Sequence, residues 1–112
     1  MENFWNTLDN LIRDKEIVID RSKGSTHPSY PDYIYPYDYG YIKYTTSADG
    51  DGIDTWLGSG DIKIVTAVIV TFDSVKNDME NKLLLGCSIP EMEEILKCHQ
   101  QGGMVAVLIV RS

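Results

Sequence analysis

The stretch from Tyr39 to Leu57 reads YGYIKYTTSADGDGIDTWL and decides the fold class. Its first part, Tyr39 to Thr46, is rich in aromatic and β-branched side chains, which favour a strand. Ala48 to Gly52 has the Asp-Gly chemistry of a tight turn, and Ile53 to Leu57 again favours a strand. Two strands joined by such a turn predict a β-hairpin.

Further strands are predicted on both sides of this hairpin. Ile62 to Phe72 is β-branched almost throughout and is the clearest strand signal in the chain. A polar stretch from Asp73 to Asn81 separates it from a short strand at Lys82 to Leu85. Glu16 to Asp20 supplies an early strand, and Met104 to Val110 predicts a buried closing strand.

Two helices are predicted, one near each end. Between Asn3 and Lys15 the apolar residues recur every three or four positions, which predicts an amphipathic helix. Ser88 and Glu91 have the spacing of a capping box and predict a second helix, which ends at Gly102. Five or six strands with two flanking helices predict a mainly β, α+β single domain over residues 1–112, closed or partly closed into a small β-barrel.

The composition excludes several classes of protein. The chain has 112 residues, 43% of them hydrophobic, which suits one domain core and argues against a disordered chain. Its 17 acids and 10 Lys and Arg give a net charge of -7, which argues against a nucleic-acid partner. No apolar run approaches the roughly 20 residues that span a bilayer, and the first residues lack a signal-peptide pattern. The two cysteines, Cys87 and Cys98, do not fit a disulfide scaffold or a zinc-site spacing and are interpreted as small buried hydrophobic residues. A reduced compartment follows, so we expect a cytoplasmic protein, and one with no membrane partner because it has no spanning segment.

Negative charge concentrates on the predicted hairpin. Asp49, Asp51 and Asp54 lie within six residues, and such carboxylates repel one another unless a cation compensates them. Hard oxygen ligands suit Mg²⁺, Mn²⁺ or Ca²⁺. An EF-hand is excluded, because its positions 5 and 12 would be Ile53 and Gly60. The cluster predicts either a divalent-cation site or a solvated turn.

A second charged group follows the long strand. Asp73, Asp78 and Glu80 precede Lys82, and this group could face the first one across the barrel or form a polar loop. Near the first strand, Arg21 and Lys23 flank a Gly/Ser loop that could hold an anion.

Two further expectations concern aromatic and histidine side chains. Four tyrosines alternate along the chain, and alternation predicts that half pack in the core and half point to the other face; they are Tyr35, Tyr37, Tyr39 and Tyr41. His99 stands near the end of the second helix, where a positive charge would favour the helix dipole.

Two motifs, in this order, resemble a known family. Tyr35 to Ile42 reads YPYDYGYI, and Asp49 to Asp54 reads DGDGID. The family I soluble inorganic pyrophosphatases carry a Tyr-Pro-x-x-Tyr-Gly-Tyr strand that runs into an Asp-x-Asp-Pro-x-Asp signature. The resemblance covers roughly residues 17 to 86 and implies an OB-like five-stranded barrel with helices.

The resemblance implies Mg²⁺-dependent hydrolysis of pyrophosphate to two phosphates, with Mn²⁺ as an alternative cation. It implies that Asp51 receives a proton from the attacking water and that the Tyr39 hydroxyl contacts that neighbourhood. The implied metal ligands are Asp49, Asp54, Asp73 and Asp78, with Glu80 as the alternative to Asp78. The implied substrate ligands are Arg21, Lys23, Tyr35 and Lys82.

The sequence departs from the family pattern at three places. Gly52 replaces the signature proline, His27 stands where a phosphate-binding arginine is usual, and the late Tyr-Lys pair has no counterpart after Lys97. A second prediction is therefore a non-catalytic relative that binds a divalent cation, a phosphate compound or a protein partner. A third is hydrolysis of another phosphate ester or a nucleotide. A homo-oligomer is also expected, paired through an exposed Phe4/Trp5 helix face.

Overall fold

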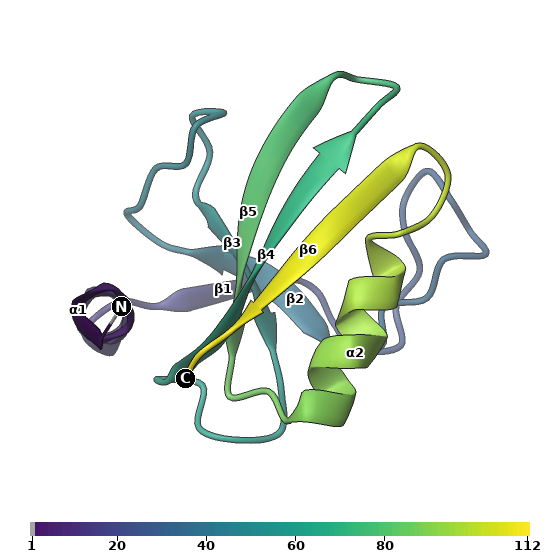
Figure 1. Cartoon of the computed structure of the whole chain (residues 1–112). Helices are drawn as coiled ribbons and strands as arrows, with labels where there is room; N and C mark the ends of the chain where they lie inside the picture. The colour runs from purple at the N-terminus through teal and green to yellow at the C-terminus, as the bar shows by residue number, and fades with distance from the viewer. Residues whose placement is uncertain (1) are drawn as a thin grey trace.

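A single mixed sheet organises the molecule, as the computed structural model of residues 2–112 shows (Figure 1). The strand order is β1-β2-β3-β5-β4-β6, and β3 and β5 form the parallel pair. In chain order the elements are α1 (Glu2–Arg13), β1 (Ile17–Arg21), β2 (Asp38–Ile42), β3 (Ile53–Leu57), β4 (Val65–Asp73), β5 (Asp78–Leu85), α2 (Ile89–Cys98) and β6 (Met104–Val110). The predicted α+β class and the β2–β3 hairpin are confirmed.

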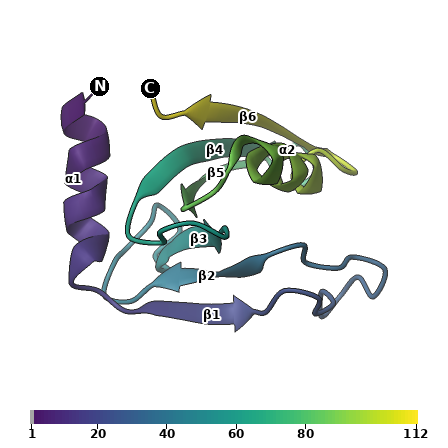
Figure 2. The same cartoon turned by 90° about the horizontal axis from the view of Figure 1, so that it is seen from below.

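The sheet is open, which corrects the predicted five-stranded barrel. It has six strands, and β1 and β6 lie at its two edges (Figure 2). A barrel buries its inner face by closing on itself, whereas here a helix packs against part of each face of the sheet. The two charged groups expected to face each other across a barrel are consequently neighbours within one sheet.

The two faces of the sheet form two separate cores. Alternating side chains of β4 point to opposite faces, so Ile69 packs with α2 while Val68 packs with α1. Trp56 is the largest side chain of the α2 core and Trp5 that of the α1 core, and both are fully buried. The expected exposed Phe4/Trp5 face is therefore wrong for Trp5, because its ring lies against the sheet.

Loop geometry sets the limits of the central strands. β2 ends at Ile42 because Tyr44 adopts a positive φ of 63°, and the Thr45 hydroxyl donates to the Ile42 carbonyl oxygen at 2.7 Å. β5 begins at Asp78, four residues earlier than predicted, because the hairpin turns at Asn77 with φ 59°. The polar stretch of the sequence is therefore partly strand, and pairing with β4 outweighs its weak strand propensity.

The predicted helix signals are confirmed and one strand prediction is corrected. Ser88 and Glu91 form the capping box that starts α2. β6 forms as predicted but is an edge strand that leaves several apolar side chains exposed, so it is not a buried closing strand. Neither α1 nor α2 has the length and apolar content needed to cross a bilayer.

Candidate functional site

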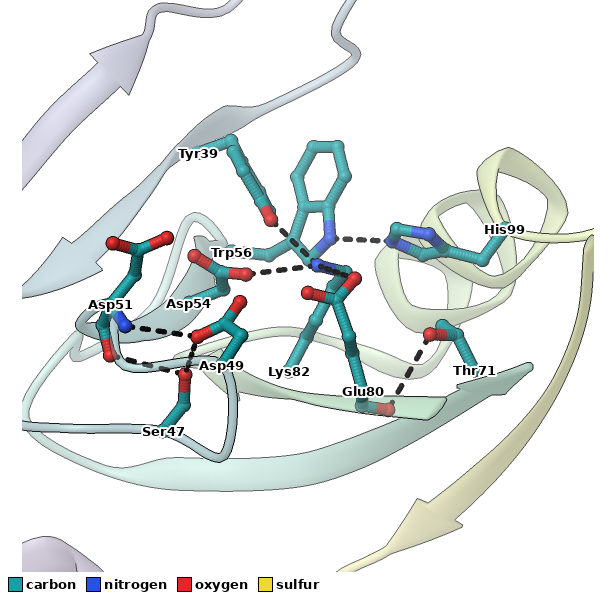
Figure 3. Close-up of polar contacts among 10 residues, drawn as sticks. All are labelled: Tyr39, Ser47, Asp49, Asp51, Asp54, Trp56, Thr71, Glu80, Lys82 and His99. Atoms are coloured by element: carbon teal, nitrogen blue, oxygen red, sulfur yellow. Dashed lines mark hydrogen bonds and ion pairs between the residues drawn. The ribbon is translucent and has the colours of Figure 1, made fainter. Parts of the chain in front are cut away.

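Lys82 is the centre of the charged side chains in the sheet (Figure 3). It lies on β5 directly beside Asp54 of β3, and its Nζ is 3.0 Å from Asp54 Oδ2. The same Nζ donates to Tyr39 Oη of β2 at 2.8 Å, and Glu80 Oε2 lies 3.8 Å away. The Lys82 side chain is only 7% exposed, so these acceptors compensate the cost of burying its charge. The parallel pairing of β3 with β5 thus assembles a buried cation with its acceptors.

Two neighbours of Lys82 have perturbed acid–base properties. Burial raises the pKa of the Tyr39 phenol, and the nearby Asp54 carboxylate raises it further, so the hydroxyl stays neutral and able to hydrogen bond. For Glu80, the Lys82 ammonium lowers the pKa, but burial and the Asp54 and Asp78 carboxylates outweigh it and the pKa is raised. The site therefore carries more negative charge than one ammonium balances.

The hairpin turn places Asp49 beside this group. Asp49 Oδ1 accepts hydrogen bonds from the Ser47 hydroxyl and from the Asp51 backbone N–H, the latter at 3.0 Å. These bonds lower the pKa of the Asp49 carboxyl, because they favour its charged form. Gly50, with φ 91°, makes the turn. The Asp51 side chain lies exposed on that turn, two residues after Asp49.

Two cavities flank Glu80, which lines both of them. The smaller, of about 240 Å³, is lined by Asp49, Asp54 and Glu80 among other residues. The larger, of about 620 Å³, contains Lys82 together with Tyr35 and Tyr39. The structure thus brings six predicted site residues to two adjoining cavities, namely Asp49, Asp54, Asp73, Tyr35, Tyr39 and Lys82, and the alternative ligand Glu80 lies between the two cavities.

The second pair of predicted metal ligands lies at the end of the β4–β5 hairpin. Asp73 lines the rim of the larger cavity, and its Oδ1 accepts from the backbone N–H groups of Val75 at 2.9 Å and Lys76 at 3.2 Å. Asp78 pairs with Asp73 across the hairpin and is exposed. Glu80 rather than Asp78 therefore shares a cavity with Asp49 and Asp54.

The two predicted basic substrate ligands line neither cavity. Arg21 Nη1 donates to the Asp20 carbonyl oxygen at 3.0 Å, and Lys23 Nζ lies 5.5 Å from the centre of the Tyr37 ring. Arg21 nevertheless influences Tyr35, which lines the larger cavity. Burial raises the pKa of Tyr35, and the positive charge of Arg21 offsets part of that rise. Among the predicted basic substrate ligands, Lys82 is the one that lines the larger cavity.

The carboxylates around the smaller cavity have the chemistry of a divalent-cation site, but their positions match such a site only in part. Asp49, Asp54 and Glu80 offer hard oxygen atoms around one small cavity, as Mg²⁺ requires. Within residues 2–112, however, no group of three or more Asp, Glu, His or Cys stands close enough together to hold a metal ion. Asp54 is instead occupied by the Lys82 ammonium.

The fold has a known counterpart among solved structures. An inorganic pyrophosphatase from Helicobacter pylori superposes with a TM-score of 0.57 at 17% sequence identity, over 87% of this chain and 83% of that one. The fold is that of an inorganic pyrophosphatase. No protein-family model and no curated protein matches the sequence.

On this pyrophosphatase-like fold, sequence reasoning gave too small a role to Glu80. It stood only as the alternative to Asp78, although Asp78, Glu80 and Lys82 alternate along β5 and share one face of the sheet. This spacing of two residues was the signal in the sequence that could have placed Glu80 on the same face as Lys82. It became visible only once the strand was known to begin at Asp78.

The environment of His99 was also misjudged. His99 is buried and its Nε2 accepts a hydrogen bond from Trp56 Nε1 at 3.0 Å. Burial, followed by the charge of Lys82, lowers the pKa of His99 to about 4. The ring is therefore neutral near pH 7, and the expected interaction of its charge with the helix dipole is wrong.

The predicted alternation of tyrosines is corrected as well. Tyr35, Tyr37 and Tyr39 all pack against the core that contains Trp56, and only Tyr39 of these three lies in a strand. Tyr35 and Tyr37 precede β2, where strand alternation does not apply. Cys87 is buried as predicted, while Cys98 is half-buried.

Proposed function

We propose that this chain hydrolyses a phosphoanhydride of the pyrophosphate class with the help of Mg²⁺. The observation that carries the proposal is the Lys82 ammonium, held between Asp54 and Tyr39 inside a cavity whose rim bears further carboxylates. The solved neighbour's description as an inorganic pyrophosphatase agrees with this chemistry.

The residues divide into those that bind phosphate and those that bind a cation. In the larger cavity Lys82 would donate to phosphoryl oxygen atoms, and the neutral Tyr39 hydroxyl would hydrogen bond beside it. Asp49, Asp54 and Glu80 surround the smaller cavity and would hold the cation there only after moving closer together, with Asp54 released from Lys82. A bound divalent cation would supply an activated water and neutralise charge on the departing phosphate. Asp51, exposed on the adjoining turn, would take the proton of that water.

One contact favours a second candidate, a domain that binds a phosphate compound without hydrolysing it. Lys82 already neutralises Asp54, so part of the carboxylate group is satisfied without a metal ion. A permanent ammonium at this place suits the retention of an anion. Hydrolysis additionally requires Asp54 to exchange its ion pair for a cation.

The test is phosphate release from pyrophosphate in the presence of Mg²⁺ or Mn²⁺. We expect release by the wild type and a loss of about 100-fold or more in two variants. Asp54→Asn removes a charged oxygen atom that lines the smaller cavity, and Asp51→Asn removes the proposed proton acceptor. Glu93→Gln is the matched control, because Glu93 lies exposed on α2 outside both cavities. No release by the wild type with either cation contradicts the enzyme proposal. Pyrophosphate binding in a calorimeter without turnover supports the second candidate.

A further inference from the structure

A row of aromatic rings leads from Lys82 towards solvent along the larger cavity. Lys82 Nζ lies 5.3 Å from the centre of the Tyr39 ring (Figure 3), and the Tyr39 and Tyr35 ring centres are 5.8 Å apart. The His27 ring is nearly parallel to that of Tyr35, at an interplanar angle of 9° and a centre-to-centre distance of 6.3 Å. His27 in turn lies 5.0 Å from the Tyr30 ring. All four rings line the same cavity as the ammonium group.

The two outer rings of this row do not serve the packing of the sheet. Tyr35 is buried in the α2 core, whereas within residues 2–112 neither His27 nor Tyr30 belongs to a core. Tyr30 is 67% exposed. The His27 ring is held in place, because its Nδ1 accepts from the Ser29 backbone N–H at 3.0 Å and its own backbone N–H donates to the Tyr33 carbonyl oxygen at 3.0 Å. A fixed ring beside an exposed one presents flat aromatic surface to a ligand.

The two ends of the larger cavity differ in chemistry. Its inner end holds the Lys82 ammonium and the Tyr39 hydroxyl, and its outer end holds the His27 and Tyr30 rings. Pyrophosphate is polar over its whole surface and would use the inner end alone. The cavity, at about 620 Å³, has the size of cavities that hold much larger organic ligands. Its walls therefore fit a ligand that carries phosphate at one end and a flat ring at the other.

We propose that the larger cavity takes a nucleoside diphosphate, whose phosphates lie at Lys82 and whose base stacks on His27 and Tyr30. Aromatic side chains suit this role, because every nucleobase has a π-face on which they can stack. The reaction at the phosphates rests on the phosphoanhydride hydrolysis proposed above. Water adds to the terminal phosphorus atom, and the bond from that atom to the bridging oxygen atom breaks, with its electron pair kept by the oxygen atom. Asp51 takes the proton of the water, and the products are a nucleoside monophosphate and phosphate.

Charge favours a diphosphate over a triphosphate. The acidic side chains of Asp32, Asp73 and Glu80 line the larger cavity together with the ammonium groups of Lys76 and Lys82. These carboxylates outnumber the ammonium groups, and each further phosphate would add negative charge that they repel. A diphosphate has the smallest number of phosphates that still contains an anhydride bond.

Calorimetry with two analogues that resist hydrolysis separates the contribution of the base from that of the phosphates. Methylenediphosphonate presents the two phosphorus groups alone, and adenosine 5′-(α,β-methylene)diphosphate adds the nucleoside. In the presence of Mg²⁺ we expect the wild type to bind the adenosine analogue at least about 10-fold more tightly, because a base stacked on an aromatic ring supplies that much affinity.

Substitution of the outermost ring locates the base. Tyr30→Ala should weaken binding of the adenosine analogue about 10-fold and leave binding of methylenediphosphonate unchanged. Tyr30→Phe keeps the ring and should bind both analogues as the wild type does. Tyr44→Ala is the matched control, because Tyr44 is 85% exposed and lines neither cavity.

The outcomes separate recognition of the base from hydrolysis. Equal affinities for the two analogues, or no binding of either, overturn the nucleoside diphosphate even when the wild type releases phosphate from pyrophosphate. So does an affinity of Tyr30→Ala for the adenosine analogue that is no lower than that of Tyr44→Ala. A preference for the adenosine analogue that is lost in Tyr30→Ala supports it, and it does so also in a protein that releases no phosphate, where the proposed hydrolysis alone is contradicted.

Discussion

Protonation of the buried histidine should weaken the fold as the pH falls. His99 is 7% exposed and accepts a hydrogen bond from Trp56 Nε1 at 3.0 Å. An imidazolium has no lone pair with which to accept that bond, and it would bring a second positive charge near Lys82. Burial first, and the charge of Lys82 second, lower the pKa of His99 to about 4.

The magnitude follows from the difference between the folded and unfolded pKa values. The unfolded chain binds the proton with a pKa of 6.5 and the folded chain with a pKa of about 4. Between these values the unfolded state holds more protons, so stability is complete above pH 6.5 and falls as the pH is lowered. The contribution lost between pH 7 and pH 5 is about 2 kcal/mol, and by pH 4 it reaches about 3 kcal/mol.

Urea unfolding of the wild type and of His99→Gln at pH 7, 6 and 5 measures this contribution. The glutamine amide oxygen can accept from Trp56 but does not titrate, so the difference in free energy of unfolding should shift by about 2 kcal/mol across this range, at the expense of the wild type. Glu80, whose pKa is raised, acts in the opposite direction, but it is present in both proteins and cancels. Parallel stability curves for the two proteins would refute the buried neutral histidine.

Two further predictions concern the frame that holds the site. Gly40→Ala should cost about 3 kcal/mol or more, because an added Cβ would lie 1.8 Å from the Val18 carbonyl oxygen of the neighbouring strand; a chemical-denaturation midpoint like that of the wild type would contradict it. Ser88→Ala should cost about 1 kcal/mol by removing the acceptor for the Glu91 backbone N–H, and thermal unfolding that does not shift by several degrees would count against the cap.

Local features of this protein were predictable from neighbouring residues alone. The capping box at Ser88, the turn at Gly50 and the β-branched run that forms β4 each depend on interactions within a few positions of the chain. The clustering of carboxylates in and around the hairpin is likewise a matter of spacing. Such patterns suffice for the α+β class and for the suggestion of a site.

The partners across the sheet required the tertiary structure. Lys82 and Asp54 are 28 positions apart, and nothing in their spacing indicates that β3 and β5 run parallel and side by side. The position of His99 against Trp56 depends in the same way on how α2 packs over the sheet.

The sequence by itself determined which segments become strands and helices and where acidic side chains gather, because propensity, capping and turn chemistry act over short distances. Only the tertiary structure decided that the sheet stays open and that β6 forms one of its edges. It also decided that the Lys82 ammonium lies between the carboxylates of Asp54 and Glu80. The physical reason is that strand order and burial are set by the packing of the whole chain, so an apolar strand such as Met104–Val110 has the same sequence pattern whether it lies inside or at the edge.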